Sequence, residues 1–147
     1  MEFKLSDYGL DVYEGNLTLV GSSSKEKGAE YWKYDLMEIS GKVIHNVGVP
    51  EKLNNYISTA LADEGDIKLE ISGTLLKSIE LSNGRIYFFG PGKNSLRNWI
   101  LLGVVTIPLY GLGFIILLLI LGTMGNRKRT KGWVAEKTAK GGIDLNP

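Results

Sequence analysis

Residues 99–125, WILLGVVTIPLYGLGFIILLLILGTMG, form an uninterrupted apolar stretch without a charged side chain. A helix rises about 1.5 Å per residue, so this stretch could reach roughly 40 Å, more than the ~30 Å hydrocarbon core of a bilayer. A soluble domain of this size has too little protein to cover every face of such a helix. The stretch therefore predicts a single transmembrane helix, with the lipid bilayer as a partner.

The flanks of this stretch carry signals for the membrane surface. Trp99 at its start and Trp133 beyond its end are indole side chains that suit the headgroup layer. A basic cluster follows the stretch and comprises Arg127, Lys128, Arg129 and Lys131. By the positive-inside rule, the C-terminal tail of residues 126–147 is expected in the cytoplasm. The absence of cysteine is compatible with a bacterial setting, so we expect a single-pass protein of a bacterial inner membrane.

A second membrane geometry uses a turn inside the stretch. Residues 108–113, PLYGLG, could separate two arms at 99–107 and 114–125, so that both soluble parts lie on one side. Arms of about 9–12 residues reach only half-way across a bilayer, and a lone hairpin cannot shield the backbone of its turn. The preferred interpretation is a single span kinked at Pro108.

Four glycines of the stretch fall on one side of a helix. At about 100° per residue, they occupy an arc of roughly 100°; they are Gly103, Gly111, Gly122 and Gly125. Small residues let transmembrane helices approach closely, which predicts a homo-oligomer or a membrane-protein partner. The stretch contains no ionisable residue, which argues against a proton relay or an ion path within this chain.

The charge is distributed unevenly along the chain. Residues 1–98 contain 11 Lys and Arg against 14 Asp and Glu, a balance of −3, whereas residues 126–147 contain 6 against 2, a balance of +4. An acidic soluble part argues against nucleic acid as a partner, because nucleic-acid affinity is largely electrostatic. The basic tail suits an anionic membrane surface.

Hydrophobic patterning predicts a small β-rich domain at residues 1–92. Alternation indicates a short edge strand at residues 3–5 and further strands at 16–21, 31–39, 42–47, 67–72, 75–81 and 85–89. The spacing of Leu53, Ile57 and Leu61 behind Pro50 predicts a helix over residues 50–62. Asn83-Gly84 favours the type I′ turn of a tight hairpin. The fold class is α+β, and one helix after three strands is compatible with an OB-like barrel.

The remaining boundaries follow from composition. Residues 93–98 form a linker between the domain and the transmembrane helix, and residues 141–147, GGIDLNP, are predicted to be disordered. The linker is short, so we expect the domain to lie close to the bilayer surface.

The sequence contains no recognisable catalytic or metal site. His45 is the only histidine, and cysteine is absent, so a catalytic triad or a multi-histidine metal site is not available within one chain. Asp63, Glu64 and Asp66 lack the residue order of a calcium loop. We therefore expect no enzyme activity, no metal and no cofactor.

Aromatic and basic residues offer one candidate ligand face. Trp32, Lys33, Tyr34 and Arg85 could stack on and neutralise a nucleotide-like ligand, although alternation also predicts that Trp32 and Tyr34 pack in the core. The sequence therefore favours a non-catalytic, membrane-anchored binding or assembly subunit. The alternative is a membrane-tethered effector that senses a small ligand.

Overall fold

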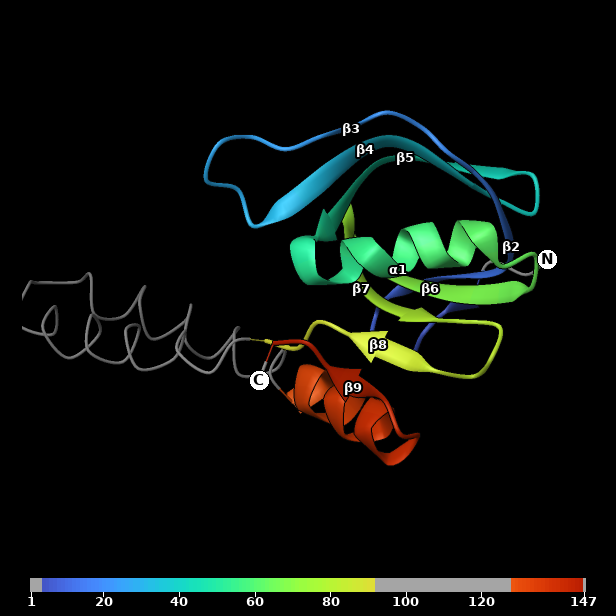
Figure 1. Cartoon of the computed structure of the whole chain (residues 1–147). Helices are drawn as coiled ribbons and strands as arrows, with labels where there is room; N and C mark the ends of the chain where they lie inside the picture. The colour runs from blue at the N-terminus through green and yellow to red at the C-terminus, as the bar shows by residue number, and fades with distance from the viewer. Residues whose placement is uncertain (1–3, 92–127, 147) are drawn as a thin grey trace, which may run out of the picture.

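The computed structural model describes residues 4–91 and 128–146 (Figure 1). These residues form a mixed α+β body in which one sheet of nine strands is combined with two helices. Neither helix within 4–91 and 128–146 has the length and apolar content needed to cross a bilayer. The predicted transmembrane stretch 99–125, with its four glycines and Trp99, lies outside the described residues, as do the linker 93–98 and Arg127.

Five strands pair in a ring that approaches a closed barrel. They are β2 (Asp11–Val20), β4 (Tyr31–Ile39), β5 (Lys42–Pro50), β7 (Leu75–Glu80) and β6 (Asp66–Ser72), given in the order of their pairing. β6 pairs with both β7 and β2, which completes the circle. The weakest link is the parallel pairing of β5 with β7, which rests on Gly48 opposite Leu75. Every other pairing in the ring is antiparallel.

The long strand β2 closes the ring by bending. Its first half pairs with β6 and its second half with β4, and the bend falls near Gly15 and Asn16. Gly15 has a φ of 139°, and a Cβ there would collide with the Ser40 hydroxyl. Glycine is thus required at this corner both for its conformation and for the close approach of the β4–β5 turn.

Helix α1 (Glu51–Ala62) follows β5 and packs into the ring. Its buried side chains are Leu53, Ile57 and Ala60, which confirms the predicted spacing, whereas Leu61 is exposed. Pro50 precedes the helix and Glu51 lies in its first turn, where a carboxylate favours the positive end of the helix dipole. In Figure 1, α1 lies between the β4–β5 hairpin and the β6–β7 pair.

Two hairpin turns, after β7 and after β4, differ in type, and the type I′ turn does not lie where the sequence predicted it. The β7–β8 hairpin exists, but Gly84 alone has a positive φ there; its amide donates to the Leu81 carbonyl, and the Leu81 amide donates to Arg85. This is a type I turn followed by a left-handed glycine, so the predicted type I′ turn is wrong. The turn between β4 and β5 has positive φ at both Ser40 and Gly41, as type I′ requires.

The main hydrophobic core fills the ring. Its fully buried members come from all five strands and α1; the largest are Leu17, Met37, Ile39, Leu53, Ile57, Leu69, Ile71, Leu76 and Ile79. Short strands extend the sheet outside the ring, namely β1 (Lys4–Leu5), β3 (Ser23–Ser24) and β8 (Ile86–Phe88). On β8, Tyr87 faces the main core and stacks on Tyr56 of α1, with ring centroids 3.8 Å apart.

The C-terminal tail is folded onto the domain. A helix covers residues 128–139 and is followed by β9 (Ile143–Asp144), which pairs in parallel with β8. Figure 1 shows this helix beside β8 and β9. The predicted disorder of residues 141–147 is therefore wrong for 141–146. The few apolar residues of that stretch gave no sign of order, but the backbone of residues 143–144 pairs with the edge strand β8.

Candidate functional site

A bulge in β7 places two consecutive side chains on the outer face of the ring. Ile71 pairs with Leu76, whereas Glu70 pairs with Ser78, so Lys77 is an extra residue without a cross-strand partner. Leu76 and Ile79 therefore both point into the core, and Lys77 and Ser78 both lie outside it. Bulges re-aim side chains in this way and are common beside functional sites.

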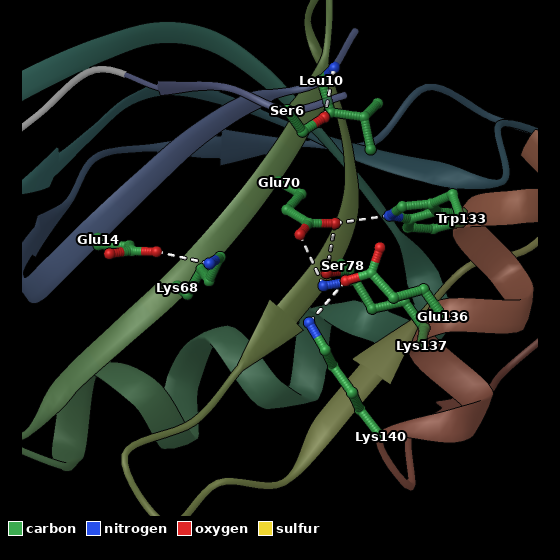
Figure 2. A network of polar contacts seen from close by, with 10 residues as sticks. All are labelled: Ser6, Leu10, Glu14, Lys68, Glu70, Ser78, Trp133, Glu136, Lys137 and Lys140. Atoms are coloured by element: carbon green, nitrogen blue, oxygen red, sulfur yellow. Dashed lines mark hydrogen bonds and ion pairs between the residues drawn. The ribbon is translucent and has the colours of Figure 1, made fainter. Parts of the chain in front are cut away.

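Glu70 is the centre of a buried polar cluster that joins the ring to the C-terminal helix (Figure 2). Lys137 Nζ donates to Glu70 Oε1 over 2.6 Å, and Trp133 Nε1 donates to Glu70 Oε2 over 2.7 Å. The Ser78 hydroxyl donates to the same Oε2 over 3.3 Å. We call these four residues the Glu70 network.

The Glu70 network is shielded from water. The Glu70 side chain is 7% exposed and the Lys137 side chain is 3% exposed. Both charges are thus largely dehydrated, and each depends on the other for compensation. All buried side-chain nitrogen and oxygen atoms within 4–91 and 128–146 have hydrogen-bond partners. Removal of one partner would leave a buried charge uncompensated.

A small apolar cluster packs beside the Glu70 network. Leu10, Phe88 and Trp133 form it, with Tyr8 and Val134 at its border. The Trp133 ring meets the Phe88 ring edge to face, with centroids 5.5 Å apart. Trp133 is only 4% exposed, so in this structure its indole packs inside the folded body, and its role at a membrane interface stays a prediction. The apolar cluster packs against the Trp133 ring, and the Glu70 carboxylate accepts from its N–H. Both the apolar and the polar part of the indole therefore have partners inside the protein, which explains its burial.

Residues 144–146 form hydrogen bonds with Gly90, near the end of the first described range. Asp144 Oδ1 accepts from the Gly90 amide over 3.1 Å, and the Asn146 side-chain amide donates to the Gly90 carbonyl over 2.8 Å. Lys52 of α1 also donates to the Leu145 carbonyl over 2.7 Å. The two flanks of the apolar stretch are therefore parts of one folded body.

A pocket of about 440 Å³ opens where these flanks meet. Its walls come from the β1–β2 loop, the β6–β7 region, the end of the first flank and the C-terminal helix; the lining residues are Tyr8, Gly9, Leu10, Ser72, Lys77, Phe89, Pro91, Arg129, Thr130 and Trp133. Lys77 and Arg129 are the two charged members of this lining, and both are cationic.

Lys77 is held in a partly dehydrated position. The side chain is half-buried, and burial lowers the pKa of Lys77 from its ordinary value. Its backbone carbonyl accepts from the Phe89 amide over 2.8 Å, which fixes the bulge. A lysine in such a site has a strong preference for an anionic partner, because its charge is poorly compensated by water.

The Tyr8 hydroxyl, at the border of the pocket, already has a hydrogen-bond partner within the fold. The Tyr8 hydroxyl is hydrogen-bonded to Glu136, which raises the pKa of Tyr8. Glu136 also accepts from Lys140 Nζ over 2.6 Å, and this bond, followed by the one from Tyr8, lowers the pKa of Glu136. The negative charge of Glu136 is therefore compensated by Lys140, and Glu136 does not line the pocket.

The residues predicted to bind a nucleotide-like ligand do not form one face. Tyr34 is buried and its hydroxyl donates to Asn54 Oδ1 over 2.6 Å. Trp32 is half-buried, with the Lys25 ammonium 5.8 Å from its ring centroid, and Lys33 is exposed. Arg85 lies in the β7–β8 hairpin, which is at the opposite end of the ring from the start of β4 (Figure 1). The topology thus separates Arg85 from the other three.

Other candidates from the sequence have ordinary surroundings. His45 is exposed on β5. Asp63 accepts a hydrogen bond from the Ser82 hydroxyl, and Glu64 and Asp66 are exposed. Across residues 4–91 and 128–146, no group of three or more histidine, cysteine or acidic side chains is arranged to hold a metal ion. The basic residues Lys128, Arg129 and Lys131 are exposed, which leaves them accessible to a membrane surface.

Sequence reasoning missed the Glu70 network and the pocket. Glu70 alternates with core residues in a strand, which is the pattern of an ordinary solvated side chain. Trp133 and Lys137 are four residues apart, so they share one face of a helix, and this spacing was the available signal. Comparison with known proteins adds no assignment, because no family model, no curated protein and no solved structure matches the chain.

Proposed function

We propose that this protein is a non-catalytic binding module held at a membrane surface by residues 99–125, with its barrel and its C-terminal helix on the same side. The observation that carries the proposal is the buried ion pair between Glu70 and Lys137. These residues belong to opposite flanks of the apolar stretch. A single crossing would put them on opposite sides of the bilayer, and each would lose its partner.

The β8–β9 pairing and the bonds at Gly90 support the same topology. Tyr87 pairs with Ile143 and Phe88 with Asp144, so the two flanks also share a sheet. Folding of this body brings residue 91 and residue 128 to one side, and in the proposed topology the stretch would both enter and leave the membrane from that side. The hairpin with a turn near Pro108 is therefore the geometry we favour, and Pro108 lacks an amide that would need a partner there.

The ring supports a binding role. We infer that it is an OB-like barrel, because its five strands pair in the order β2–β4–β5–β7–β6 and α1 follows the third of them. Barrels of this type present strand faces and loops to ligands, but a fold by itself does not fix a function. The assembly role of the four glycines remains a prediction from the sequence.

The topology can be tested by labelling single cysteines. The chain has no native cysteine, and both Ser23 and Thr138 are exposed. Ser23→Cys and Thr138→Cys, made separately, should behave alike towards a membrane-impermeant maleimide in intact cells, and both should react after lysis. Met37→Cys provides a control, because Met37 is fully buried and should stay unlabelled in the folded protein. Labelling of only one of the two exposed sites in intact cells would overturn the proposal in favour of a single crossing.

A further inference from the structure

The pocket between the two flanks has a composition suited to one chemical class of ligand. Lys77 and Arg129 contribute two positive charges, and the lining contains no carboxylate. No hydrogen bond or ion pair to the Lys77 ammonium is formed within the part of the chain that the structure describes. The bulge places Lys77 on the outer face of the ring, where it lines the pocket, and partial burial of the side chain strengthens its attraction to an anion.

The rest of the lining is apolar or weakly polar. Leu10, Phe89 and Trp133 supply carbon surface, and Ser72 supplies a hydroxyl. Such a mixture fits a ligand in which a phosphate is attached to an apolar or glycerol-like body. A bare ion would leave this carbon surface without a partner.

The position of the pocket also bears on the ligand. Pro91 and Arg129 line it; Pro91 lies eight residues before the apolar stretch and Arg129 four residues after it. If residues 99–125 enter the bilayer, the mouth of the pocket lies close to the headgroup layer. Exposed Lys128 and Lys131 would then attract anionic lipids to this region, each contributing about 1 kcal/mol.

We propose that the pocket binds the phosphate of an anionic lipid headgroup, with Lys77 and Arg129 as its two cationic contacts. This proposal rests on the membrane anchoring proposed above, and it names the ligand of that binding module. The Glu70 network acts as a support, because Trp133 both donates to Glu70 and forms a wall of the pocket. A soluble phosphate compound shares the same recognition chemistry, so the test must separate the two sources.

The test uses the full chain in micelles of a neutral detergent. Short-chain phosphatidylglycerol, short-chain phosphatidylcholine and inorganic phosphate are titrated in turn, and binding is followed by melting temperature. It is also followed by the fluorescence of a Trp32→Phe/Trp99→Phe variant, in which Trp133 of the pocket lining is the one remaining tryptophan. We expect saturable binding of phosphatidylglycerol at least about tenfold tighter than binding of the other two, because it combines a net negative charge with a glycerol body.

Matched charge variants locate the site. Lys77→Gln and Arg129→Gln should each weaken binding of phosphatidylglycerol about tenfold or more, as expected for loss of a charge-assisted contact. Lys27→Gln removes the same charge from an exposed residue outside the pocket lining, and its binding should change by less than about twofold. If Lys77→Gln fails to fold, Arg129→Gln still decides the outcome, since Arg129 is exposed.

Each alternative outcome is informative. Equal binding of phosphatidylglycerol and phosphatidylcholine, or equal losses for Lys27→Gln and Arg129→Gln, would overturn the pocket as an anion site. Inorganic phosphate binding as tightly as the lipid would overturn the lipid headgroup and leave a site for soluble phosphates. Because these titrations use detergent micelles, they do not depend on the topology, and failure of the maleimide experiment would be recognised separately.

Discussion

The ring and the junction with the C-terminal helix are stabilised in opposite ways. Inside the ring, side chains such as Leu69 and Ile79 are completely buried and wholly apolar. At the junction, a carboxylate, an ammonium and an indole N–H are buried together. An apolar core tolerates small adjustments, because dispersion and the hydrophobic effect have no direction. A buried ion pair depends on both partners being present at the correct distance.

This difference suggests what each region does for the molecule. The apolar core of the ring supplies most of the buried hydrophobic surface of the fold. The Glu70 network determines that the C-terminal helix covers the outer face of β6 and β7. An apolar surface could pack against many different helices. The buried Glu70 carboxylate instead requires a helix that presents both a lysine and an indole at the right spacing. The network therefore specifies the joining of the two flanks, and with it the proposed topology.

The largest expected effect is loss of one partner from the ion pair. Lys137→Met should lower the free energy of unfolding by about 3–5 kcal/mol, since Glu70 would remain buried without a counter-charge. Urea unfolding of the full chain in detergent measures this change. Lys140→Met is the matched control, because its pair with Glu136 is largely exposed and contributes only about 0.3–0.5 kcal/mol.

A second substitution sharpens the contrast with the ring. In Glu70→Gln/Lys137→Met, the amide oxygen can still accept from Trp133 while the buried charge is absent. We expect this double variant to recover most of the stability lost in Lys137→Met. Leu69→Ala in the ring should lose about 2–5 kcal/mol without any such rescue, because it leaves a cavity. Equal losses in the single and double variants would contradict the proposed role of the charge.

A smaller effect is expected at the indole. Trp133→Phe retains most of the ring that packs on Phe88 but removes the N–H that donates to Glu70. We expect a loss of about 1–3 kcal/mol, the cost of leaving a buried acceptor short of a donor. Trypsin digestion should then cut the C-terminal helix faster than the ring. Unchanged cleavage of that helix would contradict the idea that the network holds it in place.

The sequence predicted the ring far better than the junction. Strand 31–39 was located at its observed bounds and helix 50–62 to within one residue, because their periodic apolar residues all face one core. On the packed face of the C-terminal helix, beside the buried Lys137, the apolar cluster contains two side chains, Trp133 and Val134, too few for a periodic signal. The contact between residues 70 and 137 depends on the completed ring, so no local pattern contains it. Lys77 at the pocket depends on a bulge, which alternation alone cannot reveal.

The smallest expected effect is a pH dependence at the edge of the junction. Hydrogen bonds from Lys140 and Tyr8 hold the pKa of Glu136 below its ordinary value of 4.5. A carboxyl group with a lowered pKa stabilises the fold above its ordinary value, and this contribution is lost as the pH falls through the lowered pKa. The melting temperature of Glu136→Gln should therefore lie slightly below that of the unmodified chain at pH 7, and the two should converge as the pH falls through the lowered pKa of Glu136. In a Lys140→Met background the difference at pH 7 should shrink, because Lys140 is the main cause of the shift. A difference that stayed constant from pH 7 to pH 3 would show that Glu136 acts by packing and not by charge, and that the edge of the junction resembles the ring more than the Glu70 network.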